Sequence, residues 1–254
     1  MKLQDNILYG PVSSRRLRKS LGINLFTDKQ KICNFDCIYC QYGKTTEYMK
    51  SDDIYEYPEV DEIADNIARY IAGMGEARGF IDYITISGNG EPTLHPHFPE
   101  IVDSIITIRD EMVPNIPISL LSNGSMLYRK EIRKTVNKID LPIFKLDVGI
   151  EELFNKVNRP AKWIEFNGVV NSLKESNDVV IQSLFFHSDI LENTTEENLL
   201  PWLEIIGDIK PNLVQIYTID RGTAEGGIRP AFKEELEGIV KMVINKAGVN
   251  AIMY

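Results

Sequence analysis

Three cysteines lie close together in the stretch KICNFDCIYCQYG at residues 31–43. They are Cys33, Cys37 and Cys40, and the chain contains no other cysteine. An odd number of clustered thiols argues against a framework of disulfides. Because thiolates bind soft metals, the spacing predicts a metal or cluster site on this loop. Three buried cysteines that act only as small apolar side chains are the less favoured interpretation.

Two kinds of metal centre fit such a loop. A structural zinc ion takes four protein ligands, and the fourth would have to come from His95, His97 or His187, all distant in the sequence. A catalytic zinc held by three cysteines and a water would need a general acid or base beside it. A [4Fe-4S] cluster held by three cysteines fits better, since one of its irons stays open to bind another molecule.

The elements that position this loop follow an α/β pattern, in which short apolar segments alternate with amphipathic ones. Strands are expected at 20–26, 80–87, 116–122, 141–150, 178–187 and 212–219, with a short closing strand at 250–254. Helices are expected at 60–74, 97–112, 128–137, 163–175, 196–207 and 231–246. Since parallel strands need a long crossover, the helical segments between them predict a parallel sheet that curves into a partly closed barrel.

The chain is predicted to form a single domain over residues 1–254. Within it, 1–30 supply an N-terminal segment and the first strand, 31–43 the cysteine loop, and 44–254 the remaining β/α units. The sequence has no apolar run of about 18 residues and does not begin like a signal peptide. We therefore expect a cytoplasmic protein without a membrane partner.

Polar residues follow each expected strand, at the end where parallel α/β folds collect their chemistry. The cysteine loop follows the first strand, SGNGEP (87–92) the second and SNG (122–124) the third. Lys145 and Asp147 share one face of the fourth strand, because side chains alternate along a strand. The fifth strand carries Gln182, Ser183 and His187, and the sixth runs into YTIDRG (217–222). The layout predicts one site at one rim of the sheet.

The spacing Cys33-x-x-x-Cys37-x-x-Cys40, with Tyr39 before the last cysteine and Gly90-Glu91-Pro92 after the second strand, resembles the radical S-adenosylmethionine (SAM) superfamily. The resemblance implies a partial (β/α)6 TIM-like barrel of parallel strands. It also implies that the three cysteines ligate three irons of a [4Fe-4S] cluster and that SAM chelates the fourth. The enzyme would then cleave SAM reductively to a 5′-deoxyadenosyl radical that abstracts a hydrogen atom, with flavodoxin or ferredoxin as a reductant.

The resemblance further implies a set of residues that bind SAM. Tyr39 would lie near the adenine, and the segment from Gly88 to Glu91 would take the ammonium group, because glycines permit close backbone approach and a carboxylate accepts from a cation. For Lys145 and Asp147 a simple ion pair between the two is the alternative interpretation. The whole predicted set is Tyr39, Gly88, Asn89, Gly90, Glu91, Ser122, Asn123, Lys145, Asp147 and Gln182.

A finer resemblance concerns the substrate. The stretches YGPVSSRRLRKSLGINL (9–25), CNFDCIYCQYG and SGNGEPTLHP are similar to small radical SAM proteins related to the wyosine synthases, which modify tRNA. Archaeal wyosine synthases carry extra N-terminal cysteines for a second cluster, and related proteins have a glycine where this chain has Arg18. These differences favour another substrate. The best candidate is queuine, which a queuine lyase would convert to 7-aminomethyl-7-deazaguanine for queuosine salvage.

Charge also favours a small nucleobase or nucleoside over tRNA. The formal net charge of −9 repels polyanions, although Arg15, Arg16, Arg18 and Lys19 form a local basic segment. That segment is interpreted either as a docking patch for tRNA or as a solvated basic surface. A metal-cluster scaffold or redox sensor is the non-enzymatic alternative.

Candidate substrate contacts lie at the expected strand ends. For Asp220 and Arg221 a surface ion pair between the two is an equal alternative. His95 and His97 are expected to serve a helix N-terminus or the loop over SAM, so His187 is the histidine predicted to act. The predicted substrate group is Asn24, His187, Tyr217, Asp220 and Arg221.

Overall fold

The computed structural model describes residues 2–27, 29–50, 53, 57–75 and 80–254. Its strands are β1 (Leu8–Ser14), β2 (Arg18–Ile23), β3 (Tyr83–Ile86), β4 (Ile118–Ser122), β5 (Leu141–Lys145), β6 (Val180–His187), β7 (Leu213–Thr218), β8 (Arg229–Pro230) and β9 (Ala251–Met253). Its helices are α1 (Val60–Gly73), α2 (Phe98–Met112), α3 (Lys130–Val136), α4 (Glu151–Val157), α5 (Phe166–Lys174), α6 (Glu196–Ile209) and α7 (Lys233–Met242).

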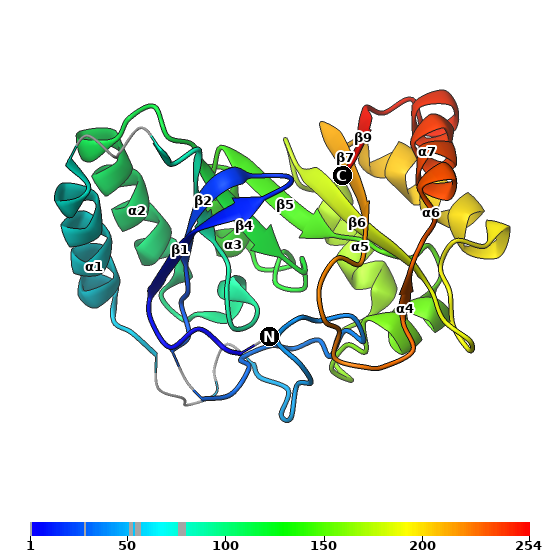
Figure 1. The fold of residues 1–254 in the computed structure, drawn as a ribbon, viewed down its shortest axis with the longest axis horizontal. Coiled ribbons are helices and arrows are strands. Elements are labelled where there is room, and N and C mark those ends of the chain that lie inside the picture. The colour runs from blue at the N-terminus through cyan, green and yellow to red at the C-terminus, as the bar shows by residue number, and fades with distance from the viewer. Residues whose placement is uncertain (1, 28, 51–52, 54–56, 76–79) are drawn as a thin grey trace.

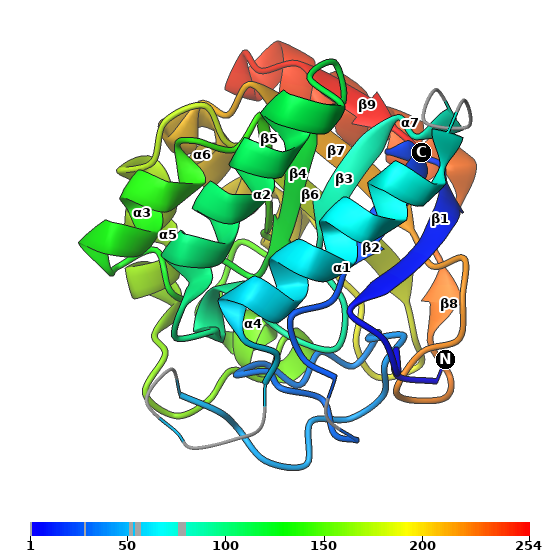
Figure 2. The same ribbon diagram turned by 90° about the vertical axis from the view of Figure 1, so that its left-hand side faces the viewer.

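The strands form a curled sheet in the order β1-β2-β3-β4-β5-β6-β7-β9. Neighbours from β2 onward are parallel, whereas β1 pairs antiparallel with β2, and β8 pairs antiparallel with the end of β6. The helices cover the outer face of the sheet, with α1 and α2 on one side and α6 and α7 on the other (Figures 1 and 2). This arrangement confirms the predicted α/β class and the partial TIM-like barrel.

Several elements differ from the expectation. Strand β1 was not among the expected strands; it contains Gly10 and Pro11, which are tolerated at the edge of a sheet. The fourth expected strand, at 141–150, is β5, and it ends at Lys145. Helix α4 begins at Glu151, where the expected strand would have ended. The apolar residues between them are buried beyond the strand, which explains why they resembled its continuation.

The outer face of the sheet and the helices share the main core. In α1 the buried residues Ile63, Ile67 and Ile71 are four apart, so they form one apolar face toward the sheet. Among the described residues, no helix is long and apolar enough to span a bilayer.

The inner face of the sheet changes in character along the strands. At the amino ends Leu17, Ile143 and Val180 form a separate buried apolar cluster, which we call the inner plug. One step further along, the buried side chains of Gln182 and Gln215 are joined by a hydrogen bond of 2.9 Å. On the same face near the amino ends, the buried hydroxyls of Ser20, Thr85 and Ser119 hydrogen-bond to one another, and the charged part of the interior lies toward the carboxyl ends.

The hairpin of β1 and β2 reaches across the open side of the half-barrel toward β7 (Figure 1). Arg15 lies 3.5 Å from Asp220, and the Arg16 guanidinium lies 4.1 Å from the centre of the Tyr217 ring. Arg18, in the turn of this hairpin, has a φ of 49°. A left-handed conformation at this turn explains why glycine suits it.

Candidate active site

The cysteine loop is bound along its start to the segment that follows β3. The Ile32 amide donates to the Asn89 carbonyl, and the Glu91 amide donates to the Ile32 carbonyl, both at 2.9 Å. A Cβ atom on Gly90 would stand 1.6 Å from the Ile32 carbonyl oxygen, so only glycine permits this approach. The two sequence motifs therefore form one backbone unit.

The connection between α4 and α5 binds the middle of the same loop. The Asp36 amide donates to the Arg159 carbonyl and the Ile38 amide to the Val157 carbonyl, each at 3.0 Å. Arg159 also holds the Glu225 carboxylate with two guanidinium nitrogens, at 2.5 and 3.1 Å. The segment after β7 is thereby fixed against the cysteine loop.

The three thiols are partly buried in this framework. Burial raises the pKa of Cys37 to about 12 and raises the pKa of Cys33 further above its ordinary range. The Phe35 amide donates to Cys33 Sγ (3.4 Å), and Asn158 Nδ2 donates to Cys37 Sγ (3.6 Å). Within the described ranges, no three Cys, His, Asp or Glu side chains are arranged to hold a single metal ion.

Glu91 is buried and links the ends of β3 and β4. One carboxylate oxygen accepts from the Ser122 hydroxyl at 2.7 Å, and the other accepts from the Asn123 amide at 2.6 Å. The amide of Thr93 adds a third donor at 3.1 Å. Burial raises the pKa of Glu91, and these donors lower it in part. Its carboxylate therefore already has several protein partners.

A buried amide network joins the end of β4 to the cysteine loop. Asn123 Nδ2 donates to Asn34 Oδ1, and Asn34 Nδ2 donates to the Ser125 hydroxyl, both at 2.8 Å. Asn34 lies directly after the first cysteine. The predicted residue Asn123 thus contacts the cysteine loop and Glu91 at once, whereas Ser122 contacts Glu91.

Asp147 is the centre of the polar interior and is almost completely buried. It accepts from Lys145 Nζ at 2.7 Å, from Asn158 Nδ2 at 2.9 Å and from the Leu184 amide at 2.8 Å. The Tyr39 hydroxyl also donates to it. One carboxylate therefore connects the cysteine loop, β5, β6 and the end of α4.

Lys145 extends this network to β7. Its Nζ donates to the Tyr217 hydroxyl at 2.9 Å and lies 5.3 Å from the centre of the Tyr39 ring. Burial lowers the pKa of Lys145, but the neighbouring Asp147 carboxylate outweighs it, so the pKa is raised. Burial, followed by the Asp147 charge, raises the pKa of Tyr39. At neutral pH Lys145 is charged and Tyr39 is a neutral donor.

Two predicted asparagines support the loops. The Asn24 side chain is buried; its amide donates to the Phe26 carbonyl (2.7 Å), and its oxygen accepts from the Asn89 amide (3.0 Å). Asn89 in turn donates to the Gln4 carbonyl at 2.7 Å. Gly88 packs against Asn24. These contacts connect the N-terminal segment to the segment of Gly88 to Glu91 that follows β3.

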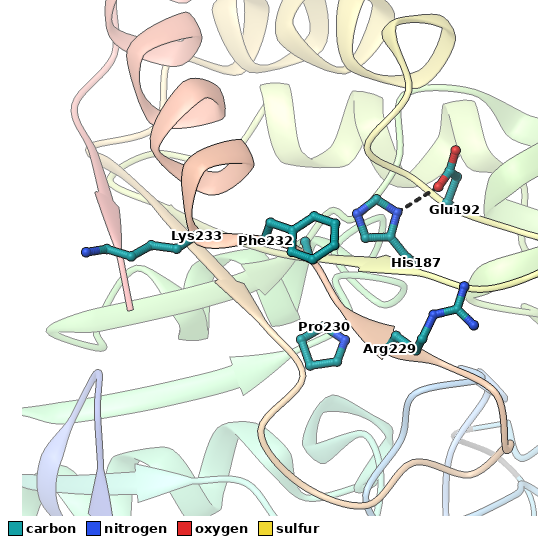
Figure 3. Close-up of a pocket in the computed structure, with 7 residues that line it drawn as sticks. His187, Glu192, Arg229, Pro230, Phe232 and Lys233 are labelled. Atoms are coloured by element: carbon teal, nitrogen blue, oxygen red, sulfur yellow. Dashed lines mark hydrogen bonds and ion pairs between the residues drawn. The ribbon is translucent and has the colours of Figure 1, made fainter.

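His187 lies apart from the Asp147 network. It lines a cavity of about 650 Å³ with Glu192, Arg229 and Phe232 (Figure 3). Its Nδ1 lies 2.7 Å from Glu192 and its Nε2 2.8 Å from Glu235. The hydrogen bond to Glu235 raises the pKa of His187, and burial opposes it only in part. The sequence predicts that the polar residues after all strands share one site. The side chain of His187, the last residue of β6, instead faces the opposite side of the sheet from Gln182.

The remaining predicted residues divide between the open side and a helix start. Asp220 pairs with Arg15, and Arg221 donates to Gln41 of the cysteine loop at 3.1 Å, so each has another partner than in the alternative interpretation of an Asp220–Arg221 ion pair. His97 precedes α2, as predicted for a helix N-terminus, and His95 is buried, with a pKa lowered by burial to about 4.

Comparison with known proteins identifies the family. A model described as "Radical SAM superfamily" matches residues 29–203, which include the cysteine loop and the strands around Asp147. The chain belongs to the radical SAM superfamily. Members of this superfamily use a [4Fe-4S] cluster and SAM, and the chain is accordingly a radical SAM enzyme.

Two relatives extend over nearly the whole chain. A UPF0026 protein of Methanocaldococcus jannaschii is 31% identical over 248 residues, covering 97% of this chain and 74% of that protein. A protein named GTPase Obg from Brachyspira hyodysenteriae is 34% identical over 238 residues, covering 93% of this chain. This radical SAM chain spans only 33% of the length of that second relative.

Solved structures share the fold at low identity. A structure of TYW1 with a lysine-pyruvate adduct bound has a TM-score of 0.64 and 15% identity, covering 91% of this chain and 75% of that one. A radical SAM methyltransferase from Sphaerobacter thermophilus has a TM-score of 0.68 and 12% identity, covering 92% and 65%. These likenesses confirm the radical SAM fold.

The residues of the site fit the cluster of a radical SAM enzyme. Three sulfurs lie on one loop, that loop is bound on its flanks, and N–H groups donate to two of the sulfurs. Hydrogen bonds to thiolate sulfurs are a normal support for iron–sulfur clusters. Cys33, Cys37 and Cys40 would therefore hold the cluster.

Sequence analysis missed several residues of this radical SAM site. Asn158 contacts both Asp147 and Cys37, while Asn34 and Ser125 connect the loops. A usable signal existed for two of them, since Asn34 is adjacent to Cys33 and Ser125 follows the SNG motif. No comparable signal marks Asn158, which lies at the end of a helix that we did not expect.

Proposed function

We propose that this radical SAM enzyme acts on a small substrate inside the half-barrel. When bound, the cluster and SAM supply a 5′-deoxyadenosyl radical that takes a hydrogen atom from the substrate. The observation that carries the proposal is the Asp147 network. It joins Tyr39 of the cluster loop to Lys145 and Tyr217, and so places fixed polar groups next to the cluster loop.

The polarity of the interior supports a small polar substrate. The inner plug of Leu17, Ile143 and Val180 fills its amino-terminal end. Above the plug, Gln182, Gln215 and Tyr217 offer hydrogen-bonding groups on the same face of the sheet. Side chains that are held by their neighbours orient a substrate at low entropic cost and exclude water.

The roles of the SAM-binding residues are part of the proposal. The backbone of Gly88 to Glu91 would receive the SAM ammonium group, because Glu91 itself is occupied by Ser122, Asn123 and Thr93. Asp147 would keep Tyr39 and Lys145 in place beside SAM. Gln182, bonded to Gln215, lies on the same inner face as Lys145.

Within this class we propose queuine as the substrate and 7-aminomethyl-7-deazaguanine as the product. The diol and the aminopurine edge of queuine need hydrogen-bond partners. Tyr217 lies beside Lys145, and Arg221 lies against the cysteine loop, which supports these two as contacts. Asp220 lies near Arg15 at the open side of the half-barrel. Asn24 and His187 are bonded to Phe26 and Glu235, outside the Asp147 network, so their contacts do not support a role in binding queuine.

A tRNA substrate is the competing proposal. Its docking patch would be Arg15, Arg16, Arg18 and Lys19. Arg15 and Arg18 lie near the acidic partners Asp220 and Asp82, at 3.5 and 3.9 Å, and the chain carries a net charge of −9. Both facts favour the small substrate, since a nucleic-acid site needs a long row of free cations.

The test compares three substrates under anaerobic conditions. Reconstituted enzyme, SAM and a reductant are incubated separately with queuine, its nucleoside and bulk tRNA, and the products are followed by mass spectrometry. We expect 5′-deoxyadenosine and the released base with queuine, and neither with Cys37→Ala. If 5′-deoxyadenosine rises only with tRNA, the lyase proposal is wrong. Flavodoxin and ferredoxin are compared in the same assay as electron donors.

A further inference from the structure

A second cavity lies at the amino ends of the strands, away from the cysteine loop. It is a groove of about 620 Å³, and its wall includes the residues just before β3 and β4. The cysteine loop and Glu91 follow the carboxyl ends of the neighbouring strands, and the inner plug lies between the two regions. We call this cavity the basal groove. It is lined by Arg15, Arg16, Arg18, Asp82, Tyr83, Pro117, Ile252 and Tyr254.

The basal groove concentrates positive charge on an acidic protein. Three arginines line it, whereas the nearby carboxylates are Asp82 in the lining and Asp220, which lies 3.5 Å from Arg15; the whole chain has a net charge of −9. Asp82 is itself engaged, since it accepts from the Lys19 amide at 3.0 Å and lies 3.9 Å from Arg18. The lining therefore keeps an excess of positive charge.

Arg16 is the arginine whose environment is incomplete. Its Nη1 atom is buried and has no hydrogen-bond partner among the residues that the structure describes. Its contact is the face of the Tyr217 ring, 4.1 Å from the guanidinium carbon. A ring face attracts a cation but accepts no strong hydrogen bond, so it leaves the guanidinium without a counter-ion. A partly buried cation without a counter-ion is costly, and an anionic ligand would remove that cost.

The other groups of the groove suit the same kind of ligand. Arg15 and Arg18 lie on either side of Arg16 in the chain and are exposed, and Tyr83 and Tyr254 add hydroxyl groups. Burial raises the pKa of Tyr254, so its hydroxyl remains a donor at neutral pH. Guanidinium groups bind phosphate oxygens with paired, charge-assisted hydrogen bonds.

We infer that the basal groove binds the phosphate group of a small molecule, with Arg16 as its central ligand. A phosphate monoester presents three acceptor oxygens, so it can bind Arg16 and its neighbouring donors at the same time, which a single carboxylate does less fully. An RNA backbone fits less well, because it needs a row of cations, whereas Lys19 beyond this groove packs on Phe80 (5.0 Å). The inference does not depend on the substrate of the radical reaction.

The experiment measures binding of inorganic phosphate to the purified protein without SAM or reductant. Ligand-observed phosphorus NMR at constant ionic strength gives the affinity. We expect saturable binding that becomes at least tenfold weaker in Arg16→Gln. The matched control is Arg69→Gln, which removes an exposed arginine of α1 and leaves the affinity unchanged. Failure of the queuine assay would not affect this result.

Two further variants keep the test decisive if Arg16→Gln folds poorly. Arg18→Gln changes a side chain that is 81% exposed and is expected to weaken phosphate binding a few-fold. Tyr254→Phe keeps the ring and should weaken binding by a smaller factor. Equal affinity in all variants, or no saturable binding, overturns the inference. Arg16-dependent binding of bulk tRNA in the absence of phosphate binding would also overturn it and assign the groove to RNA.

Discussion

The interior around Asp147 and the cavity around His187 both pair a basic side chain with a carboxylate, but in opposite surroundings. The Asp147 side chain has no exposed surface and holds Lys145, which is 19% exposed. The His187 side chain is also only 17% exposed, but its partners Glu192 and Glu235 are 41% and 35% exposed. Water can replace the partners of His187 and cannot replace those of Lys145. The first pair therefore fixes structure, and the second responds to pH.

The position of each pair follows from the alternation of side chains along a strand. In β6, Gln182 lies beside Lys145 in register and bonds to Gln215 on the inner face. His187 lies five residues further, an odd number, so it points to the other face. Tyr217 lies two residues after Gln215 and returns to the inner face. The ends of the strands thus supply two different sites. Once one residue of a strand is known to face the interior, counting residues along that strand tells which face every other side chain lies on.

The largest difference between the two regions is expected from Asp147→Asn. This change leaves the buried Lys145 without a counter-charge, which should lower the free energy of unfolding by about 3–5 kcal/mol. Urea unfolding measures the effect. Glu235→Gln is the matched control at the exposed pair, with an expected loss below about 1 kcal/mol. Equal losses in the two variants would contradict the contrast.

The next effect concerns the inner plug beneath the Asp147 network. Leu17→Ala removes a side chain that is 4% exposed and leaves a cavity, so the free energy of unfolding should fall by about 2–4 kcal/mol. Leu200→Ala, at a position on α6 that is 46% exposed, should change it by less than about 0.5 kcal/mol. A small effect of Leu17→Ala would mean that the hairpin is not part of the packed interior.

A smaller effect is expected from the pH response of His187. Its pKa in the folded protein lies above the ordinary value, so its contribution to stability is present below about pH 6.5 and is lost as the pH rises through the folded pKa. His187→Gln should therefore cost about 0.5–1 kcal/mol in mildly acidic buffer and less in alkaline buffer. Denaturant unfolding at two pH values measures the difference. A cost that does not change with pH would show that the carboxylates do not act through the His187 charge.

The smallest expected change in the free energy of unfolding is an increase, and it comes from Arg18→Gly. Arg18→Gly relieves a left-handed backbone at the hairpin turn and removes only an exposed contact of 3.9 Å with Asp82. We expect the free energy of unfolding to rise by about 0.5 kcal/mol. Lys19→Gly, one residue later in β2, should lower it by about 0.5–1 kcal/mol, because glycine in a strand loses more conformational entropy on folding and packs no side chain. Thermal unfolding of both variants checks the pair, and a loss in Arg18→Gly would contradict the assignment of strain.

The fold and the family were predictable because their signals are local. Apolar periodicity located six parallel strands, and the spacing of Cys33, Cys37 and Cys40 carried the family resemblance. The strand β1 was missed because an edge strand tolerates Gly10 and Pro11, which normally mark a turn. Helix α4 was missed because only tertiary packing separates it from the strand before it.

The partners within the site were harder to predict because they depend on three-dimensional register. The ion pair of Lys145 with Asp147 was one of two open interpretations, since both residues lie close in sequence. The contact between Asn158 and Asp147 requires the chain to turn back after β5, which no local pattern specifies. The face of His187 was predictable in principle, because it follows from counting residues in β6.

The sheet has two free edges, β1 and β9, and side chains such as those of Arg15 and Asp220 bridge the space between the hairpin and β7. No backbone ladder joins these edges in the described part of the chain, so opening along this line breaks side-chain contacts alone, from the exposed pair of Arg15 and Asp220 to the packing of Leu17. Salt weakens such contacts, whereas it hardly affects a strand ladder. Amide hydrogen exchange should therefore be fastest along this line, and should increase there first as ionic strength rises. The molecule would then admit small molecules by loosening along one boundary while the cluster loop stays in place.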